Sequence, residues 1–514
     1  MINTLVELSL RYKLLTLVAF AVIAFLGWRA VNTVPIDAFP DLTPIQVNVY
    51  TESPGLAAED VEELLTFPVE SGMAGLSGVQ QIRSVSLFGL SYVSVYFDDD
   101  VDIYFARRLV MERLQEVGER IPEGYGTPEM GPNTSALGQV FWYTIERTDQ
   151  ALEAATSDMD LRTVQDWSVR LVLRTVPGVD DVMSWGGQER QYQVQIDPRQ
   201  LIAYDLDYRT VLEAIEANNG QVGGQYINLG PEQYLVRGLG LVKNTDDIGD
   251  IVLKAVDGVP VRIRDIAQIE EAPALRFGAV TRDGEEVVLG MALARIGENA
   301  KVVVDAVKEK IATASTILPQ TMQLRPVYDR TDLVDKAVDT AVTALLQGAI
   351  LVAIVLFLFL GELRSAAVVI AALPMAMLIA FIFMEQVGLS ANLMSLAGLA
   401  IGIGMVVDGA VVITENSFRI MAQRQAEGGE VNRVDAVLAA AREVANPIAF
   451  AILIIIVVFL PLFSLEGLEG KLFKPMAFNI SFAMAGSLLL TLTLIPVLAA
   501  LLLKPHEERD TRLV

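Results

Sequence analysis

A carboxylate stands inside one of the most apolar stretches of this 514-residue chain. The segment 392–413 has the composition of a membrane helix, and it contains Asp408, with Glu415 seven residues further on. An ionised Asp near the centre of a bilayer costs ~2.5–3.5 kcal/mol on insertion scales. We therefore expect Asp408 to face the interior of a helix bundle, to pair with a cation, or to be protonated part of the time. Burial away from water favours the neutral carboxyl, which suits a side chain that carries protons.

The spacing of Asp408 and Glu415 puts both on one side of the predicted helix. Seven residues are two turns, or ~10.5 Å along the axis. Mostly small residues recur on the same side at three- and four-residue steps: Gly398, Gly402, Met405 and Val412. This pattern predicts close packing against a neighbouring helix. No Lys or Arg lies at the depth of Asp408 in the predicted spans, so its cationic partner comes from elsewhere or it titrates alone. Glu415 lies near the helix end, where solvation by water is an equally good interpretation.

Two other sets of residues invite a chemical role, and we assign each a structural one. Methionines in apolar spans could bind Cu(I) or Ag(I), but they fill space more often. The run Asp98-Asp99-Asp100 with Asp102 is interpreted as the end of a strand and the cap of the next helix, and not as a cation site.

Six segments are apolar over the ~20 residues that a membrane helix needs. They are approximately 14–31, 337–360, 366–384, 392–413, 447–463 and 476–503. No small-residue cleavage site follows the first, which we interpret as a retained anchor. Basic residues gather before span one, between spans two and three, between spans four and five and after span six, which predicts that both termini are cytoplasmic. Lys471 and Lys474, between spans five and six, are exceptions to this rule.

The net charge of −24 belongs to one part of the chain. Between Thr33 and Asp335 there are 48 acidic and 25 basic residues, out of 63 and 39 in the whole chain. This acidic block lies between the first two spans and is expected on the outer side of the membrane. The chain has no cysteine and one histidine, His506, which excludes disulfides, thiolate nucleophiles and histidine-based metal cages or triads. No Walker-type motif is present, so we expect no nucleotide or other cofactor.

The acidic block has the pattern of a folded α+β structure. Strand patterns at 45–51 and 91–97 alternate with helix patterns at 56–73 and 103–119, which predicts ferredoxin-like units. The stretch 76–84 is echoed by 176–184, and this internal repeat indicates two duplicated subdomains. We place the first at 33–134, the second at 135–186 and 273–330, and an inserted subdomain at 187–272.

The predicted fold class is therefore a multi-pass α-helical membrane protein with six spans and a large extracytoplasmic α+β block of ferredoxin-like subdomains. Residues 1–32 form the first transmembrane helix, and 331–503 form helices two to six with a cytoplasmic loop at 415–446. Residues 504–514 form a cytoplasmic linker.

Several motifs resemble those of resistance-nodulation-division (RND) efflux pumps of the heavy-metal branch. They are Pro35-Ile36-Asp37-Ala38-Phe39-Pro40-Asp41-Leu42-Thr43, Phe88-Gly89-Leu90-Ser91, Gln165-Asp166-Trp167, Val176-Pro177-Gly178-Val179, and Val407-Asp408-Gly409-Ala410-Val411-Val412 followed by Glu415-Asn416. The resemblance runs along the whole chain. It implies the N-terminal half of an inner-membrane transporter, not an enzyme, that exports heavy-metal cations in exchange for protons. It also implies two porter subdomains and a docking subdomain, a homotrimer, and as partners a C-terminal half, a periplasmic adaptor and an outer-membrane channel, with no nucleic acid.

The same resemblance assigns roles to three acids. Asp408 falls on the proton-relay aspartate, Glu415 on a secondary acid, and Asp166 is a candidate metal ligand in the porter cleft. Zinc- and cobalt-type relatives often carry Asp-Phe-Gly where this chain has Gly402-Ile403-Gly404, and some zinc-type members carry Glu in place of Gln139. Organic compounds therefore remain an alternative substrate class. A receptor or scaffold that does not transport remains an alternative of another kind.

Overall fold

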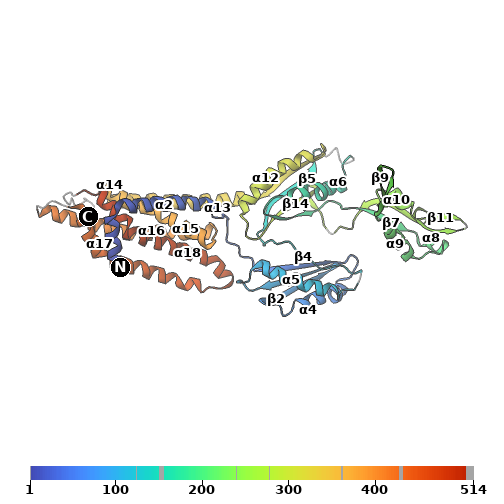
Figure 1. Ribbon diagram of the computed structural model, residues 1–514, viewed down its shortest axis with the longest axis horizontal. Coiled ribbons are helices and arrows are strands. Elements are labelled where there is room, and N and C mark those ends of the chain that lie inside the picture. Colours follow the sequence, from blue (N-terminus) through green and yellow to red (C-terminus); the bar gives the residue numbers. More distant parts are fainter. Residues whose placement is uncertain are drawn as a thin grey trace.

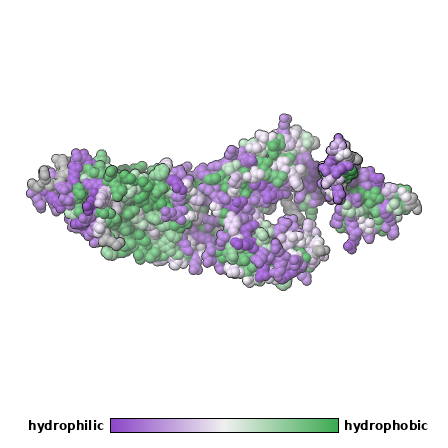
Figure 2. Space-filling model, viewed as in Figure 1, coloured by the Kyte–Doolittle hydropathy of each residue, from purple (hydrophilic) through white to green (hydrophobic). Residues whose placement is uncertain are grey.

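The chain forms two parts arranged end to end, a bundle of long helices and an α+β block (Figure 1). The computed structural model describes residues 2–122, 124–149, 155–238, 240–256, 258–276, 278–360, 363–427 and 432–504. The bundle is largely hydrophobic on the face seen in Figure 2, and the block is largely hydrophilic. The predicted linker beyond Lys504, with His506, and part of the predicted loop at 415–446 lie outside the described residues.

Among the described residues, six helical spans are long and apolar enough to cross a membrane, which confirms the six predicted ones. In chain order they are α2 (Lys13–Thr33), α13 (Arg330–Leu360), α14 (Leu363–Ile370) with α15 (Ala372–Val387), α16 (Leu393–Ala426), α17 (Arg433–Phe463) and α18 (Gly467–Leu492). The short helices α1 (Ile2–Arg11) and α19 (Leu494–Leu502) pack against α17. The stretch predicted as a loop at 415–446 is helical as far as Ala426 and again from Arg433, because its Arg, Gln and Ala residues favour the helix beyond the apolar span.

The core of the bundle lies around α16, which contacts α13, α15, α17 and α18. Leu, Ile, Val and Ala side chains make up most of this core. Met484 is fully buried in it, and Met375, Met377 and Met405 pack against it. These methionines therefore fill space between helices, as the sequence predicted.

The first α+β unit is a four-stranded antiparallel sheet. One helical connection lies between its first and second strands in chain order, and another lies between its third and fourth. Its strands are β1 (Gln46–Glu52), β2 (Val79–Leu87), β3 (Leu90–Phe97) and β4 (Glu129–Met130), in the spatial order β2-β3-β1-β4. The helical segments are α3 (Ala58–Val61), the π-helical turn η1 (Glu62–Thr66), α4 (Phe67–Met73) and α5 (Ile103–Gly118). Asp102 caps α5, since its carboxylate accepts a hydrogen bond of 2.9 Å from Phe105 N. This order is the ferredoxin-like arrangement that the sequence predicts.

The second unit has the same arrangement, with a long insertion. Its strands are β5 (Gln139–Arg147), β6 (Val179–Trp185), β14 (Glu285–Ala294) and β15 (Met322–Asp329), in the order β6-β14-β5-β15, with β13 (Val280–Arg282) paired to the start of β14. The helical segments are α6 (Asp158–Val164), the π-helical turn η3 (Gln165–Val169), α7 (Arg170–Leu173) and α12 (Ala300–Ile317). The last strand, β15, continues into the membrane helix α13 without an intervening residue.

The helical segments of the two units repeat each other at a spacing of 100 residues. Buried pairs at this spacing are Val61 and Leu161, Val69 and Val169, and Met73 and Leu173. Phe67 and Trp167 form a matching exposed pair, with 64% and 75% of their surfaces accessible. Each unit also carries a π-helical turn in this segment. The structure thus repeats itself, as the sequence echo at 76–84 and 176–184 predicts.

The insertion projects from the second unit at the end far from the bundle (Figure 1). A two-stranded ribbon of β7 (Arg190–Ile196) and β12 (Ala267–Pro273) connects it. Beyond the ribbon lie two hairpins and four short helices: β8 (Val222–Leu229) with β9 (Glu232–Gly238), β10 (Val252–Val256) with β11 (Val259–Arg262), α8 (Pro198–Ala203), α9 (Tyr208–Ala217), α10 (Thr245–Gly249) and α11 (Ile263–Ile266).

Candidate functional site

Helix α16 carries Asp408 and Glu415 and is fixed from its first turn. Asn392, which is buried, accepts a hydrogen bond from Ser395 N at 3.0 Å, and its own N–H donates to Ser395 Oγ at 2.8 Å. This capping box satisfies N–H groups that would otherwise be unpaired in an apolar environment. Asn479 of α18 also donates to Ser395 O at 2.8 Å. The start of the helix that carries the candidate proton carrier is therefore held in place.

Three glycines of α16, Gly398, Gly402 and Gly409, face α18. A Cβ atom added to Gly398 would lie 2.6 Å from Met476 O, and one added to Gly409 would lie 3.0 Å from Thr491 Oγ1. The predicted packing through small residues is therefore right. The prediction that Asp408 shares this face is wrong, because the step of ten residues from Gly398 to Asp408 separates their directions by ~80° around the helix.

Asp408 and Glu415 lie on an exposed face of α16. Ile401, Gly404, Asp408, Val412 and Glu415 follow one another there at three- and four-residue steps, and all are exposed. Within the described ranges, no side chain forms an ion pair or hydrogen bond with the Asp408 carboxylate. An apolar stripe with one carboxylate is unfavourable against lipid, so protein or water must cover it.

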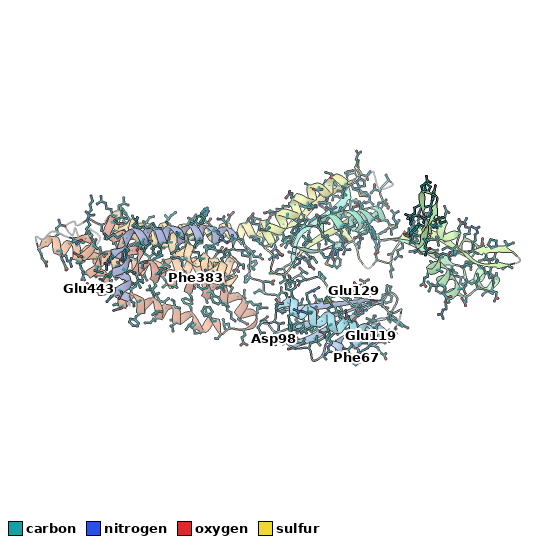
Figure 3. The ribbon with its side chains drawn as sticks, viewed as in Figure 1. Phe67, Asp98, Glu119, Glu129, Phe383 and Glu443 are labelled. Atoms are coloured by element: carbon teal, nitrogen blue, oxygen red, sulfur yellow. The ribbon has the colours of Figure 1, made fainter. Side chains whose placement is uncertain are left out.

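Glu415 lies among polar residues near the end of the bundle that is away from the α+β block. Its neighbour Asn416 donates to Glu443 Oε2 of α17 at 3.0 Å, and Arg419 donates to Asn416 Oδ1 at 2.7 Å. Figure 3 shows Glu443 at the end of the bundle away from the α+β block. Glu415 thus has polar surroundings that Asp408 lacks.

Asp166 lies in the second α+β unit and is not brought together with Asp408 or Glu415. It stands on η3, where one carboxylate oxygen accepts a hydrogen bond of 2.6 Å from Arg162 Nε. The other oxygen is buried without a hydrogen-bond partner. Among the residues that the structure describes, no group of three or more His, Cys, Asp or Glu side chains is arranged to hold a metal ion. A cation bound through both oxygens of Asp166 would have to displace the Arg162 guanidinium.

An ion pair that was not predicted from the sequence lies at the junction of bundle and block. Arg330, the first residue of α13, donates to both carboxylate oxygens of Asp37 at 2.7 and 2.8 Å, and only 8% of its side chain is exposed. Beside this pair, Asp37 N donates to Ala391 O at 3.1 Å and Ala391 N donates to Pro35 O at 2.8 Å. The exit of α2, the entry of α13 and the start of α16 are therefore connected. The one sequence feature that could have indicated this ion pair is Arg330 itself, a basic residue at the start of the second span.

Comparison with known proteins identifies relatives of this arrangement. The chain is 43% identical over 522 residues to the cation efflux system protein CzcA of Alcaligenes sp., and 39% identical over 506 residues to the cation efflux system protein CusA of Escherichia coli K12. These alignments cover 100% and 97% of this chain, and 49% and 48% of the two relatives. A crystal structure of a heavy metal efflux pump matches with a TM-score of 0.85 and 35% identity, over 97% of this chain and 48% of that one.

The chain spans about half the length of the curated relatives it matches. A third relative, the nickel and cobalt resistance protein CnrA of Cupriavidus metallidurans, is 35% identical over all of this chain and 50% of its own length. Residues 5–514 match the AcrB/AcrD/AcrF family as a whole. The chain therefore belongs to the AcrB/AcrD/AcrF family.

Proposed function

We propose that this chain is the N-terminal half of a proton-driven RND efflux pump that exports heavy-metal cations. The observation that carries the proposal is Asp408, a carboxylate inside a membrane helix, on a face that the described helices leave exposed. The relatives named above for cation efflux and for nickel and cobalt resistance support the choice of metal ions over organic compounds.

Asp408 is the proton carrier in this proposal. The free energy of placing a neutral carboxyl in an apolar environment is far lower than that of a carboxylate. Protonation of Asp408 therefore favours an arrangement of the helices that buries it, and deprotonation favours one that gives it water or a countercharge. A proton that crosses 100 mV supplies ~2.3 kcal/mol, and ~1.4 kcal/mol corresponds to a tenfold concentration ratio. One proton per transported cation therefore supports more than tenfold accumulation. The segment that covers the exposed face of α16 supplies the countercharge for the deprotonated state.

The architecture supports the assignment of parts to roles. The two ferredoxin-like units, 33–134 and 135–186 with 273–330, are porter subdomains, and the insertion 187–272 is a docking subdomain. The bundle lies in the inner membrane with both chain termini in the cytoplasm and the α+β block in the periplasm. The pump works as a homotrimer with a second half of its own length, a periplasmic adaptor and an outer-membrane channel. Glu415 is a secondary acid on the proton path, and Asp166 remains a predicted cation ligand.

The proposal is tested by Asp408→Asn in the complete transporter, expressed in a strain that lacks its own metal efflux systems. We measure growth in Zn²⁺, Co²⁺, Cd²⁺, Ni²⁺ and Ag⁺ salts, with dyes and detergents as a second panel. Asp408→Asn should abolish resistance to the exported ion. The matched control is Glu466→Gln, an exposed carboxylate just before α18, which should leave resistance unchanged. Unchanged resistance in Asp408→Asn refutes the proton-carrier role, and resistance only to dyes and detergents refutes the metal substrate.

A further inference from the structure

Lys471 connects the membrane helices to the first α+β unit. It lies near the start of α18, where its Nζ is 2.7 Å from Asp99 Oδ1 and donates to Thr43 O at 2.8 Å. These contacts explain why a lysine lies between spans five and six, although the distribution of basic residues places that loop on the outer side of the membrane, where few are expected. Figure 3 shows Asp98, the neighbour of Asp99, at the end of the first unit that faces the bundle.

Both partners of Lys471 lie in segments that join structural elements of the block. Asp99 stands in the turn between β3 and α5, where Asp98 N donates to Gly78 O at 2.9 Å. Thr43 precedes β1, and its hydroxyl accepts a hydrogen bond of 3.2 Å from Ala136 N, at the start of the second unit. A force on Lys471 therefore acts on the sheet and helix of the first unit, and on the segment that leads to the second.

Helix α18 is in turn held along α16. Its backbone at Met476 touches Gly398, and Asn479 donates to Ser395 O at 2.8 Å. Further along, Ser487 Oγ donates to Val406 O at 2.7 Å, two residues before Asp408. Because these contacts fix the two helices at several levels, a displacement of α16 near Asp408 moves α18 with it.

The second unit is held by a different membrane helix. Strand β15 continues directly into α13, and Lys308 of α12 pairs with Asp329 and donates to Thr331 Oγ1 at 3.0 Å. Lys301 of α12 also pairs with Asp335 of α13 at 2.6 Å. Apart from the segment 33–38, which Asp37 joins to Arg330 of α13, the first unit is thus tied to α18, and the second is tied to α13.

We infer that Lys471 is a positioning residue that couples the α16–α18 pair to the first α+β unit through Asp99 and Thr43. Movement of α16 and α18 relative to α13 then changes the position of the first unit relative to the second. This inference rests on the proposed function, because it assumes that a change at Asp408 displaces α16.

The test uses the complete transporter in proteoliposomes, with the ion of the panel above that the unsubstituted protein exports. Lys471→Met removes the charge, and Lys471→Arg conserves it. A charge exchange, Lys471→Glu with Asp99→Lys, restores the pair in the opposite sense. Matched controls are Lys474→Met on the same helix and Asp100→Lys in the same turn, since neither residue forms an ion pair with a described one.

The diagnostic quantity is the number of cations exported per proton taken up. Lys471→Met should lower this ratio by roughly fivefold, which is about 1 kcal/mol and the upper value for a partly exposed ion pair. A merely structural defect would lower cation export and proton uptake together and leave the ratio unchanged. Lys471→Arg should restore most of the ratio, the charge exchange should restore the part that depends on the pair with Asp99 but not the part that depends on the bond to Thr43 O, and both controls should keep the ratio.

A second readout does not depend on transport. The chain has no cysteine, so spin labels at Glu119→Cys on the first unit and Leu468→Cys at the start of α18 report one distance within the chain when labelled protein is mixed with an excess of unlabelled protein. That distance should be single in the unsubstituted protein and broadly distributed in Lys471→Met. An unchanged ratio and an unchanged distance in Lys471→Met overturn the inference, as does an equal fall in Lys474→Met. If Asp408→Asn still exports, the proposed function fails. If Asp408→Asn is inactive and the Lys471 variants behave normally, only this inference fails.

Discussion

The ion pair between Asp37 and Arg330 gives the sharpest stability prediction. Only 8% of the Arg330 side chain is exposed, and both oxygens of Asp37 accept from it. Asp37→Asn leaves the guanidinium without a countercharge but keeps an Oδ1 that can accept the bond from Ala38 N. Removing one partner of a buried pair costs ~3–5 kcal/mol. Because 25% of the Asp37 side chain is exposed to water, we take the lower value of about 3 kcal/mol.

This free energy converts into a measurable shift of the melting temperature. With an unfolding entropy of about 2.1 cal/mol/K per residue, a block of ~300 residues loses about 5 °C for 3 kcal/mol. The assay is thermal denaturation in detergent followed by tryptophan fluorescence. Three of the four tryptophans, Trp142, Trp167 and Trp185, belong to the second unit, so the signal reports on the block.

The controls separate the charge pair from the amide substitution itself. Asp41→Asn changes a nearby exposed carboxylate that, among the described residues, accepts only from Thr43 N, and it should shift the melting temperature by less than about 1 °C. The double variant Asp37→Asn with Arg330→Met removes both charges and should recover most of the loss. Equal shifts in Asp37→Asn and Asp41→Asn would refute the reasoning, and so would a double variant as unstable as Asp37→Asn.

Three further predictions use thermal denaturation in detergent, followed by the helical circular dichroism signal for the bundle and by tryptophan fluorescence for the block. Gly398→Ala should destabilise the bundle by about 1–3 kcal/mol, because its Cβ would lie 2.6 Å from a carbonyl oxygen of α18; a Cβ at Gly404 meets no atom within 4 Å, so Gly404→Ala should not destabilise the bundle. Tyr143→Phe should cost about 1–3 kcal/mol, because the buried Gln165 Oε1 loses its 3.0 Å hydrogen bond; no loss would mean that Gln165 finds another donor. Burial raises the pKa of Asp329, but hydrogen bonds from a neighbouring lysine and threonine outweigh it and hold the pKa below its usual 3.8. The stability from this carboxylate is therefore present above about pH 4 and is lost as the pH falls through the lowered pKa, so Asp329→Asn should weaken the acid-induced fall in melting temperature.

The large elements of the fold were predictable because their signals are long and periodic. Each membrane span repeats an apolar composition over more than a dozen residues, and each ferredoxin-like unit repeats strand and helix patterns in a fixed order. Asp408 was predictable for a different reason, which is the cost of a charge in an apolar helix. The pattern was wrong about the side of α16 on which Asp408 lies. Successive steps of three and four residues do not return to the same side of the helix, so Asp408 and Gly398 point in different directions.

Contacts between distant parts of the chain were not predictable from local patterns. Asp37 with Arg330, and Asp99 with Lys471, join residues hundreds of positions apart that meet only when the bundle and the block assemble. The pairing of Asp166 with Arg162 is different, because a base and an acid four residues apart on a helix are neighbours. That spacing was visible in the sequence and argues for an ion pair at this position.

The direct continuation of β15 into α13 has a consequence for the geometry of the whole molecule. Every residue added to a helix turns its following side chains by ~100°. One residue inserted between Asp329 and Arg330 would therefore rotate all of α13 against the second unit by more than a quarter of a turn. The same insertion in the irregular segment 39–45, on the other path between bundle and block, would change only the course of a loop. The rotation of α13 relative to the sheet of the second unit is thus fixed by the direct connection of Asp329 to Arg330. The other connection between bundle and block imposes no such rotation.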